Sequence, residues 1–179
     1  MRYGKLEDEM RRKAIFLIVV LCILFLAGCG KDKDNGKYHI VYLNKDKTGI
    51  VEAAYKNEAK DKTGLIEEFF AALSSDPDDV DYRKPIPNDV EITKYSVDGA
   101  LLSVYFDSDY LKMNEVEEVL CRAAIVRTLT QVEGIDCVTF YVDETPLTDA
   151  NGKVIGTMYA DSFVENPGEQ INSIQNTNL

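Results

Sequence analysis

The segment Asn114–Asp143, NEVEEVLCRAAIVRTLTQVEGIDCVTFYVD, decides the fold of this chain. Its first part, Val116–Val132, consists mostly of good helix formers and contains neither glycine nor proline, which predicts one long helix. Gly134 follows at a position where a helix C-cap favours a residue that tolerates a left-handed backbone. The last part, Cys137–Asp143, alternates apolar and polar residues and predicts a strand with one buried face. A helix that turns back along such a strand is the nucleus of a two-layer α/β domain.

The predicted long helix carries two apolar stripes on roughly opposite sides. One stripe contains Val116, Val119, Leu120, Ala123 and Val126, and the other contains Cys121, Ile125, Leu129 and Val132. A helix on one open sheet needs a single apolar stripe. The second stripe is therefore covered either by another helix and loops of the same chain, or by another protein.

The residues before this segment predict a second helix and four further strands. Tyr38–Asn44 and Ile50–Tyr55 are expected as strands, and Lys62–Ser74 as a helix with apolar residues at i, i+4, i+7 and i+8. Asp98-Gly99 predicts a two-residue type I′ turn between two more strands. The pairs on the helix-facing side of this hairpin would be Val97/Ala100, Tyr95/Leu102, Thr93/Val104 and Glu91/Phe106. The sequence thus predicts an α/β fold of the α+β two-layer sandwich kind, with a mixed or antiparallel sheet of about four to five strands and two helices on one face.

The other face of the predicted sheet is a candidate surface for a protein partner. By alternation it contains Ile92, Leu101, Tyr105 and Tyr141, interleaved with Lys94, Ser103 and Thr139. An aromatic sheet face also suits stacking on RNA. The charge of the chain decides between these two interpretations.

The N-terminus has the parts of a secretory signal peptide. Arg11-Arg12-Lys13 precede a 14-residue apolar run, which is shorter than the roughly 20 residues that a spanning helix needs. The run ends in Leu26-Ala27-Gly28-Cys29, which resembles the lipobox of bacterial lipoproteins, where the cysteine thiol receives the lipid. Residues 1–28 are therefore expected to be removed, and Cys29 to anchor the mature chain to the outer face of the cell membrane.

The mature chain would be strongly acidic. Of the 20 basic and 31 acidic residues, five basic and three acidic ones lie in residues 1–28, which leaves a net charge of −13. Such a charge argues against electrostatic binding of nucleic acid. The sheet face is therefore predicted to bind protein and not RNA.

Two cysteines remain in the folded part, and we expect both to be free thiols. Cys121 lies 11 residues before Val132, about 16 Å along the helix. Cys137 opens the strand beyond the far end of that helix. A disulfide needs Cα atoms within about 7 Å, so this pair is too far apart.

The sequence predicts no catalytic residue, no metal site and no cofactor. The acidic stretches near Asp32, Asn44 and Asp76 lack the central Gly or the final Glu of a twelve-residue calcium loop. His39 is the only histidine, and no partner spacing makes it a zinc ligand. Phosphate-binding loops and nucleophile motifs are absent as well. A protein that is not an enzyme is the simplest interpretation.

Several blocks resemble the GerMN domain of sporulation and spore germination proteins. They comprise Ile86-Pro87, Thr93–Phe106, Ala123–Gln131, Gly134–Asp136, Val138 and Val142-Asp143. The family pattern usually has Asp-Gly before the Pro of the last turn, whereas this chain has Glu144, so a differently shaped turn is expected. The resemblance implies a fold like the ring-building motifs of secretion and spore-channel proteins, a role in assembly, and no catalytic residues.

These features divide the chain into a signal peptide (1–28), a flexible tether (29–37), a GerMN-like domain (38–160) and a polar tail (161–179) that is too poor in apolar residues to fold alone. Two functions stay open. The chain is either an assembly module that binds a protein of the cell envelope, or a lipoprotein that holds a cell-wall fragment or small solute. A flat apolar patch favours the first function, and a deep pocket with converging polar groups favours the second.

Overall fold

The computed structural model describes residues 36–163. The predicted signal peptide, Cys29 and its lipobox, and residues 164–179 of the predicted tail lie outside the described residues. Within residues 36–163, no helix is both long and apolar enough to cross a membrane.

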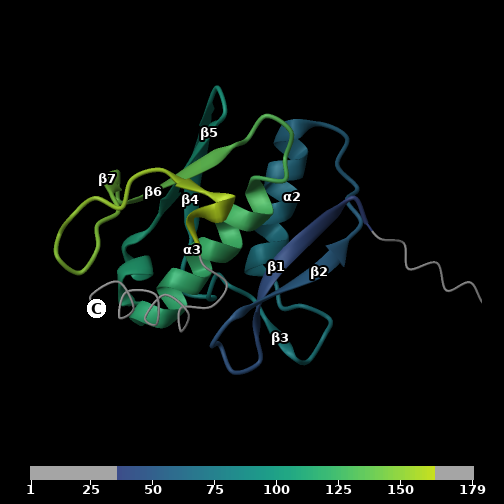
Figure 1. Cartoon of the computed structure of the whole chain (residues 1–179), viewed down its shortest axis with the longest axis horizontal. Coiled ribbons are helices and arrows are strands. Elements are labelled where there is room, and N and C mark those ends of the chain that lie inside the picture. Colours follow the sequence, from purple (N-terminus) through teal and green to yellow (C-terminus); the bar gives the residue numbers. More distant parts are fainter. Residues whose placement is uncertain (1–35, 164–179) are drawn as a thin grey trace, which may run out of the picture. The chain divides into compact units, whose positions relative to one another are not determined.

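The strands form two separate sheets (Figure 1). In the first sheet, β1 (Tyr38–Asn44) lies between β2 (Ile50–Tyr55) and the short β3 (Tyr82–Arg83), and both pairings are antiparallel. The second sheet has the order β4 (Ile92–Asp98), β5 (Leu101–Phe106), β6 (Cys137–Val142) and β7 (Thr145–Pro146), and β8 (Met158–Tyr159) also pairs with β6. Only β5 and β6 are parallel. The predicted α+β class with a mixed sheet is confirmed, and the first two strands belong to a sheet of their own.

In the described part of the chain two α-helices accompany these sheets, α2 (Lys62–Ser74) and α3 (Glu115–Leu129). The side chain of Asp61 accepts a hydrogen bond from the Gly64 N–H at 2.8 Å and thereby caps α2. Asn114 caps α3 in the same way. The helix α3 ends three residues before the predicted end, and the left-handed Gly134 (φ 76°) lies in the turn that follows. Two short 3-10 helices, η1 (Ser108–Lys112) and η2 (Ala160–Ser162), complete the fold.

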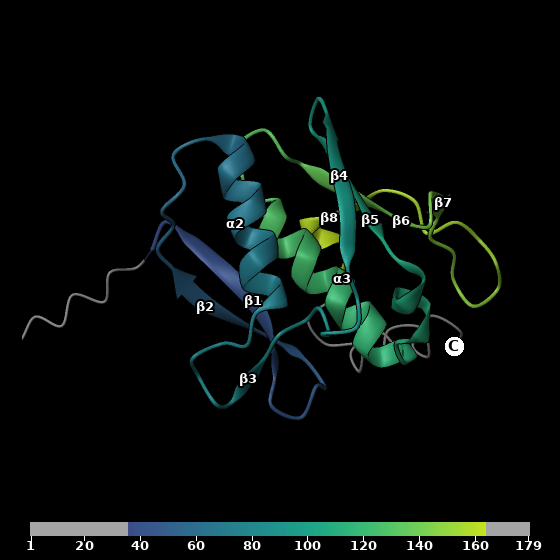
Figure 2. The same cartoon turned by 180° about the vertical axis from the view of Figure 1, so that it is seen from behind.

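The helix α3 lies between the two sheets, with α2 beside it (Figures 1 and 2). It contacts β1 and β2 on one side and β6 and β8 on the other. This position explains the second stripe and the later part of the first, because each sheet covers one side of the helix. Ala123 and Val126 of the first stripe are buried, whereas Val116 and Val119 are exposed. Cys121, Ile125, Leu129 and Val132 are all buried within the chain. The alternative that another protein covers this stripe is therefore wrong.

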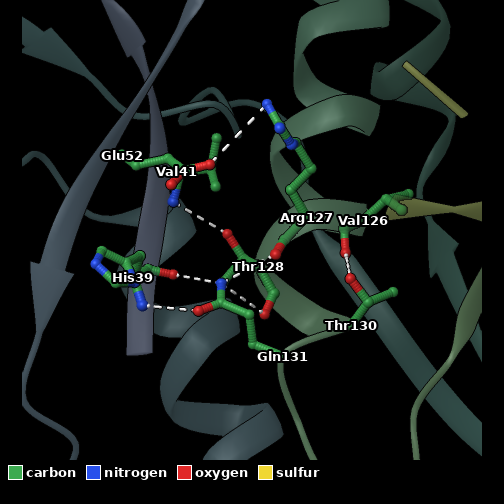
Figure 3. A network of polar contacts seen from close by, with 8 residues as sticks. All are labelled: His39, Val41, Glu52, Val126, Arg127, Thr128, Thr130 and Gln131. Carbon is green, nitrogen blue, oxygen red and sulfur yellow. Dashed lines mark hydrogen bonds and ion pairs between the residues drawn. The ribbon is translucent and has the colours of Figure 1, made fainter. Parts of the chain in front are cut away.

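Side chains of α3 and the turn after it complete the hydrogen bonding of β1 (Figure 3). The strand β3 pairs only with Leu43 and Asn44, so the preceding residues of β1 have no strand beside them on that edge. There the Thr128 Oγ1 accepts from the Val41 N–H at 3.1 Å. Gln131 accepts from the His39 N–H at 2.8 Å and donates to the His39 carbonyl at 2.7 Å. A helix thus covers an edge that would otherwise bury unsatisfied backbone groups.

The β4–β5 hairpin has a register two residues away from the predicted one. Asp98 pairs with Leu101, so the turn residues are Gly99, with φ 59°, and Ala100. A glycine at the first turn position satisfies a two-residue hairpin as well as one at the second. A shift of two keeps the face of each side chain, so Tyr95 still faces the helices and lies 5.5 Å from Phe70.

A β-bulge overturns one predicted site residue. The register shifts between Ile92 and Lys94, so Ile92 pairs with Phe106 and packs against the core. One extra residue, Thr93, reverses the alternation before it. The prediction that Ile92 lies on the face opposite the helices is wrong.

Candidate interaction face of the five-stranded sheet

The face of the second sheet that turns away from α3 is formed by three cross-strand rows. The strand registers place these side chains together: Asp98, Leu101, Cys137 and Tyr159; Ser96, Ser103 and Thr139; and Lys94, Tyr105, Tyr141 and Pro146. We call these residues the open face. The side chains between them point to the helices, and those of β5 and β6 are buried.

The centre of one row is a stacked pair of tyrosines. The rings of Tyr105 and Tyr141 are 4.6 Å apart between centroids and nearly parallel, with an interplanar angle of 15°. The Lys94 ammonium lies 4.3 Å from the centroid of the Tyr105 ring. It also forms an ion pair with Glu144 at 2.6 Å. The rings and the alkyl stem of the lysine thus form an ordered column at the protein surface.

The other rows combine hydroxyl groups and apolar side chains. The hydroxyls of Ser103 and Thr139 share a hydrogen bond of 3.1 Å. Tyr159, at the end of its row, is 50% exposed. Cys137 is partly buried, and both Cys121 and Cys137 are free, as predicted.

Three of the four predicted partner-binding residues lie on the open face, namely Leu101, Tyr105 and Tyr141. Ile92 is excluded by the bulge. Sequence reasoning missed Tyr159, because its strand has only two residues and carries no alternation signal. It also missed Glu144, whose approach to Lys94 depends on the β6–β7 turn.

A separate polar cluster lies between η1 and the first half of α3. Arg122 is 8% exposed and donates to both carboxylate oxygens of Glu118, at 2.6 and 2.8 Å. The buried Tyr110 hydroxyl donates to Glu118 at 3.0 Å. One carboxylate therefore satisfies both of its buried neighbours, as a charge in a protein interior requires.

The electrostatics of this cluster do not activate a nucleophile. Burial, together with the nearby Cys121 and Glu118, raises the pKa of Tyr110 well above its ordinary value. Burial also raises the pKa of the Cys121 thiol, with a contribution from Glu118. Both groups are therefore protonated near neutral pH. A catalytic thiol or base requires the opposite shift, or a pKa close to neutrality.

The hollows of the described surface are open and of mixed character. One of about 520 Å³ lies beside the start of β1 and α2, and its lining includes Lys37, Lys60 and Lys62. Another of about 560 Å³ lies beside the Arg122 cluster, and its lining includes Leu111 and Val119. Among residues 36–163, no group of three or more His, Cys, Asp or Glu side chains could hold a metal ion.

Fold and surface together define a small α+β domain in which α3 packs between two sheets and the described residues leave one sheet face uncovered. A family profile described as Germane, sporulation and spore germination, matches residues 40–148. The chain belongs to this family, and the resemblance to GerMN domains is confirmed. A search of curated proteins gives no match.

Two solved structures show the same fold. The tandem GerMN domains of the sporulation protein GerM from Bacillus subtilis are similar with a TM-score of 0.59 and 15% sequence identity, over 73% of this chain and 49% of that one. The chain therefore spans about half the length of that tandem structure. The first GerMN domain of the same protein is similar with a TM-score of 0.56 and 16% identity, over 70% of this chain and 98% of that domain.

Proposed function

We propose that this chain is a lipid-anchored, extracytoplasmic assembly module that acts in sporulation or spore germination by binding an envelope protein through its open face. The anchor is the lipid on Cys29, and the binding residues are Tyr105, Tyr141, Leu101 and Tyr159. No chemical step belongs to this role. The family supports the biological setting, and the N-terminal sequence supports the anchor.

The observation that carries the proposal is the ordered tyrosine column on a sheet face that residues 36–163 leave uncovered. Stacked rings held by Lys94 are already fixed in one arrangement, so they lose little conformational entropy when a partner covers them. Tyrosine is also among the residue types that contribute most to protein interfaces. Elsewhere in the described domain, the large apolar side chains of α2 and most of those of α3 are buried in its own core.

The alternative, a binding site for a cell-wall fragment or small solute, requires polar groups that converge in an enclosed pocket. In the hollow beside Arg122, that guanidinium is already bound by Glu118. The hollow lined by lysines is open, and one of them, Lys62, donates to the Gly134 carbonyl at 2.9 Å. These arrangements favour the assembly module.

A pair of tyrosine substitutions tests the face. In sporulating cells, the Tyr105→Ser, Tyr141→Ser double variant should lose most of the crosslinked partner that the natural chain captures. The matched control is Tyr42→Ser, Tyr82→Ser, which removes the other stacked tyrosine pair, with centroids 6.1 Å apart on the first sheet. Equal capture by both double variants, with both folded by circular dichroism, would refute the proposed face.

The anchor has its own test. Mass spectrometry of the mature chain should find a diacylglyceryl group on Cys29 and no residues before it. Cys29→Ser should release the chain from the membrane fraction. If this variant is still processed and retained, the lipid anchor is wrong, whatever the result for the tyrosines.

A further inference from the structure

The strand β4 forms an edge of the five-stranded sheet, and no other described strand pairs with its outer side (Figure 2). All of its residues except Ile92 and Tyr95 are exposed, and Val97 exposes 40% of its surface. An unpaired edge presents a row of backbone N–H and C=O groups that can pair with another strand.

Only the C-terminal part of β4 pairs regularly with β5. The bulge lies on one side of Lys94, and the Gly99-Ala100 turn begins after Asp98. The regular part is therefore Lys94–Asp98, and Ser96 is its midpoint. A bulge commonly protects an edge from further pairing, but this one leaves five residues unprotected.

The hairpin geometry determines which residues of β4 can bond outward. A two-residue loop makes Asp98 and Leu101 the closing, hydrogen-bonded pair, and such pairs alternate along an antiparallel ladder. Ser96 and Lys94 then also bond inward to β5. The N–H and C=O groups of Tyr95 and Val97 point outward and are available to a new strand.

We propose that two copies of this chain pair through β4, antiparallel and centred on Ser96. In this register the outward backbone N–H and C=O groups of Tyr95 bond to those of Val97 in the second copy. By symmetry, Val97 of the first copy bonds to Tyr95 of the second. Tyr95 and Val97 then lie side by side on the helix-facing side, an aromatic and β-branched combination that favours strand pairing. On the open face, Lys94 lies opposite Asp98 of the second copy, so two opposite-charge pairs form.

Neighbouring registers lack this complementarity. Residues whose backbone groups point outward must lie opposite each other in the two copies. Moving the two-fold centre by one residue shifts every pair by two and keeps this condition, so the neighbouring registers are centred on Tyr95 and on Val97. A centre at Tyr95 would place Asp98 opposite Ile92, on the far side of the bulge. A centre at Val97 would place Lys94 opposite Ala100 in the turn, and Asp98 opposite Ser96. Only the centre at Ser96 uses the whole regular part of β4 and matches both charges.

The pairing also has a consequence for the open face. Residues opposite each other in an antiparallel pair share a face, so the two sheets join with both open faces on the same side. The dimer would present two tyrosine columns to one partner assembly and raise avidity without any new contact. The self-pairing itself does not depend on the partner or on the lipid.

A cysteine at the two-fold centre tests the register. In this geometry, Ser96 lies opposite Ser96 of the second copy in a non-hydrogen-bonded pair, where Cα atoms are about 4.5 Å apart and a disulfide can form. Under mild oxidation, most of the full-length Ser96→Cys chain should run as a dimer on a non-reducing gel. The control is the Ser75→Cys variant, which keeps the same natural cysteines. Ser75 is exposed and lies at the end of α2, away from β4. Equal crosslinking of the two variants would overturn the proposal.

The charge pairs give a second, independent measurement. Asp98→Lys and Lys94→Glu each place like charges together, so each variant alone should dimerise about 5- to 30-fold more weakly in analytical ultracentrifugation. A mixture of the two variants restores both opposite-charge pairs and should form heterodimers about as tightly as the natural chain dimerises. Circular dichroism of each variant establishes that it is folded. Failure of the mixture to recover association would overturn the proposed pairing.

Discussion

Glu144 holds a backbone conformation that usually requires glycine. It has φ 66°, and the preceding Asp143 has φ 46°. Val142 pairs with Thr145, so these two residues form a two-residue hairpin turn with both φ values positive, as in type I′. In this chain Glu144 therefore adopts the left-handed backbone at the position where the family pattern has Gly.

This strain predicts a stabilising substitution. A left-handed residue that is not glycine costs roughly 1–2 kcal/mol, of which the greater freedom of glycine in the unfolded chain offsets roughly half. Glu144→Gly should therefore be more stable to urea than Glu144→Gln by about 0.5–1 kcal/mol. Both variants lose the Lys94 ion pair, so the comparison isolates the backbone. A Gln variant as stable as the Gly variant would show that the turn carries no strain.

For single residues, the sequence identifies glycines with a left-handed backbone better than it identifies other residues with an irregular backbone. Gly99 and Gly134 are recognisable as left-handed positions, and both have positive φ. The bulge at Thr93 has no comparable signal, because β-branched Thr is an ordinary strand residue. Its Oγ1 donates to the Tyr105 carbonyl at 3.2 Å, a contact known only once the register is known. That single residue decides whether Ile92 belongs to the site.

The elements themselves follow from local pattern. The strands β1 and β2 and the helix α2 have the predicted bounds, because each combines a clear period with a turn or a cap at its ends. The division into two sheets does not follow from local pattern. It depends on Thr128 and Gln131, which bond to the edge of β1 from a helix about 90 residues away in the sequence.

The hydrogen bond between Thr128 and β1 predicts that replacing one hydroxyl by a methyl group lowers the stability of the domain. Thr128→Val keeps the shape of the side chain but leaves the buried Val41 N–H without its acceptor, which costs about 1–3 kcal/mol. Urea unfolding should show this loss. The matched control is Thr130→Val, because the Thr130 hydroxyl donates only to the Val126 carbonyl one turn earlier in the same helix. Equal losses for the two variants would mean that the bond to β1 adds nothing to stability.

At the scale of the whole domain, α3 joins two sheets that share no backbone pairing within residues 36–163. One core contains Ile40 of β1, Ile125 of α3 and Phe140 of β6, all buried. Each sheet alone would leave one side of α3 exposed, so neither is expected to stay folded without the other. A three-layer arrangement of this kind depends on contacts between residues that are distant in sequence. The sequence indicates it through the two apolar stripes of α3.

The shared helix predicts that the domain unfolds as one cooperative unit. Hydrogen exchange measured by mass spectrometry compares the most protected amides of Tyr38–Asn44 in the first sheet with those of Cys137–Val142 in the second. In the natural chain, both should exchange with the free energy of global unfolding. Thr128→Val acts directly only on β1, yet it should lower protection in both strands by the same amount, about 1–3 kcal/mol. If protection falls in Tyr38–Asn44 while Cys137–Val142 keeps its own, the first sheet opens separately, and α3 does not couple the two sheets.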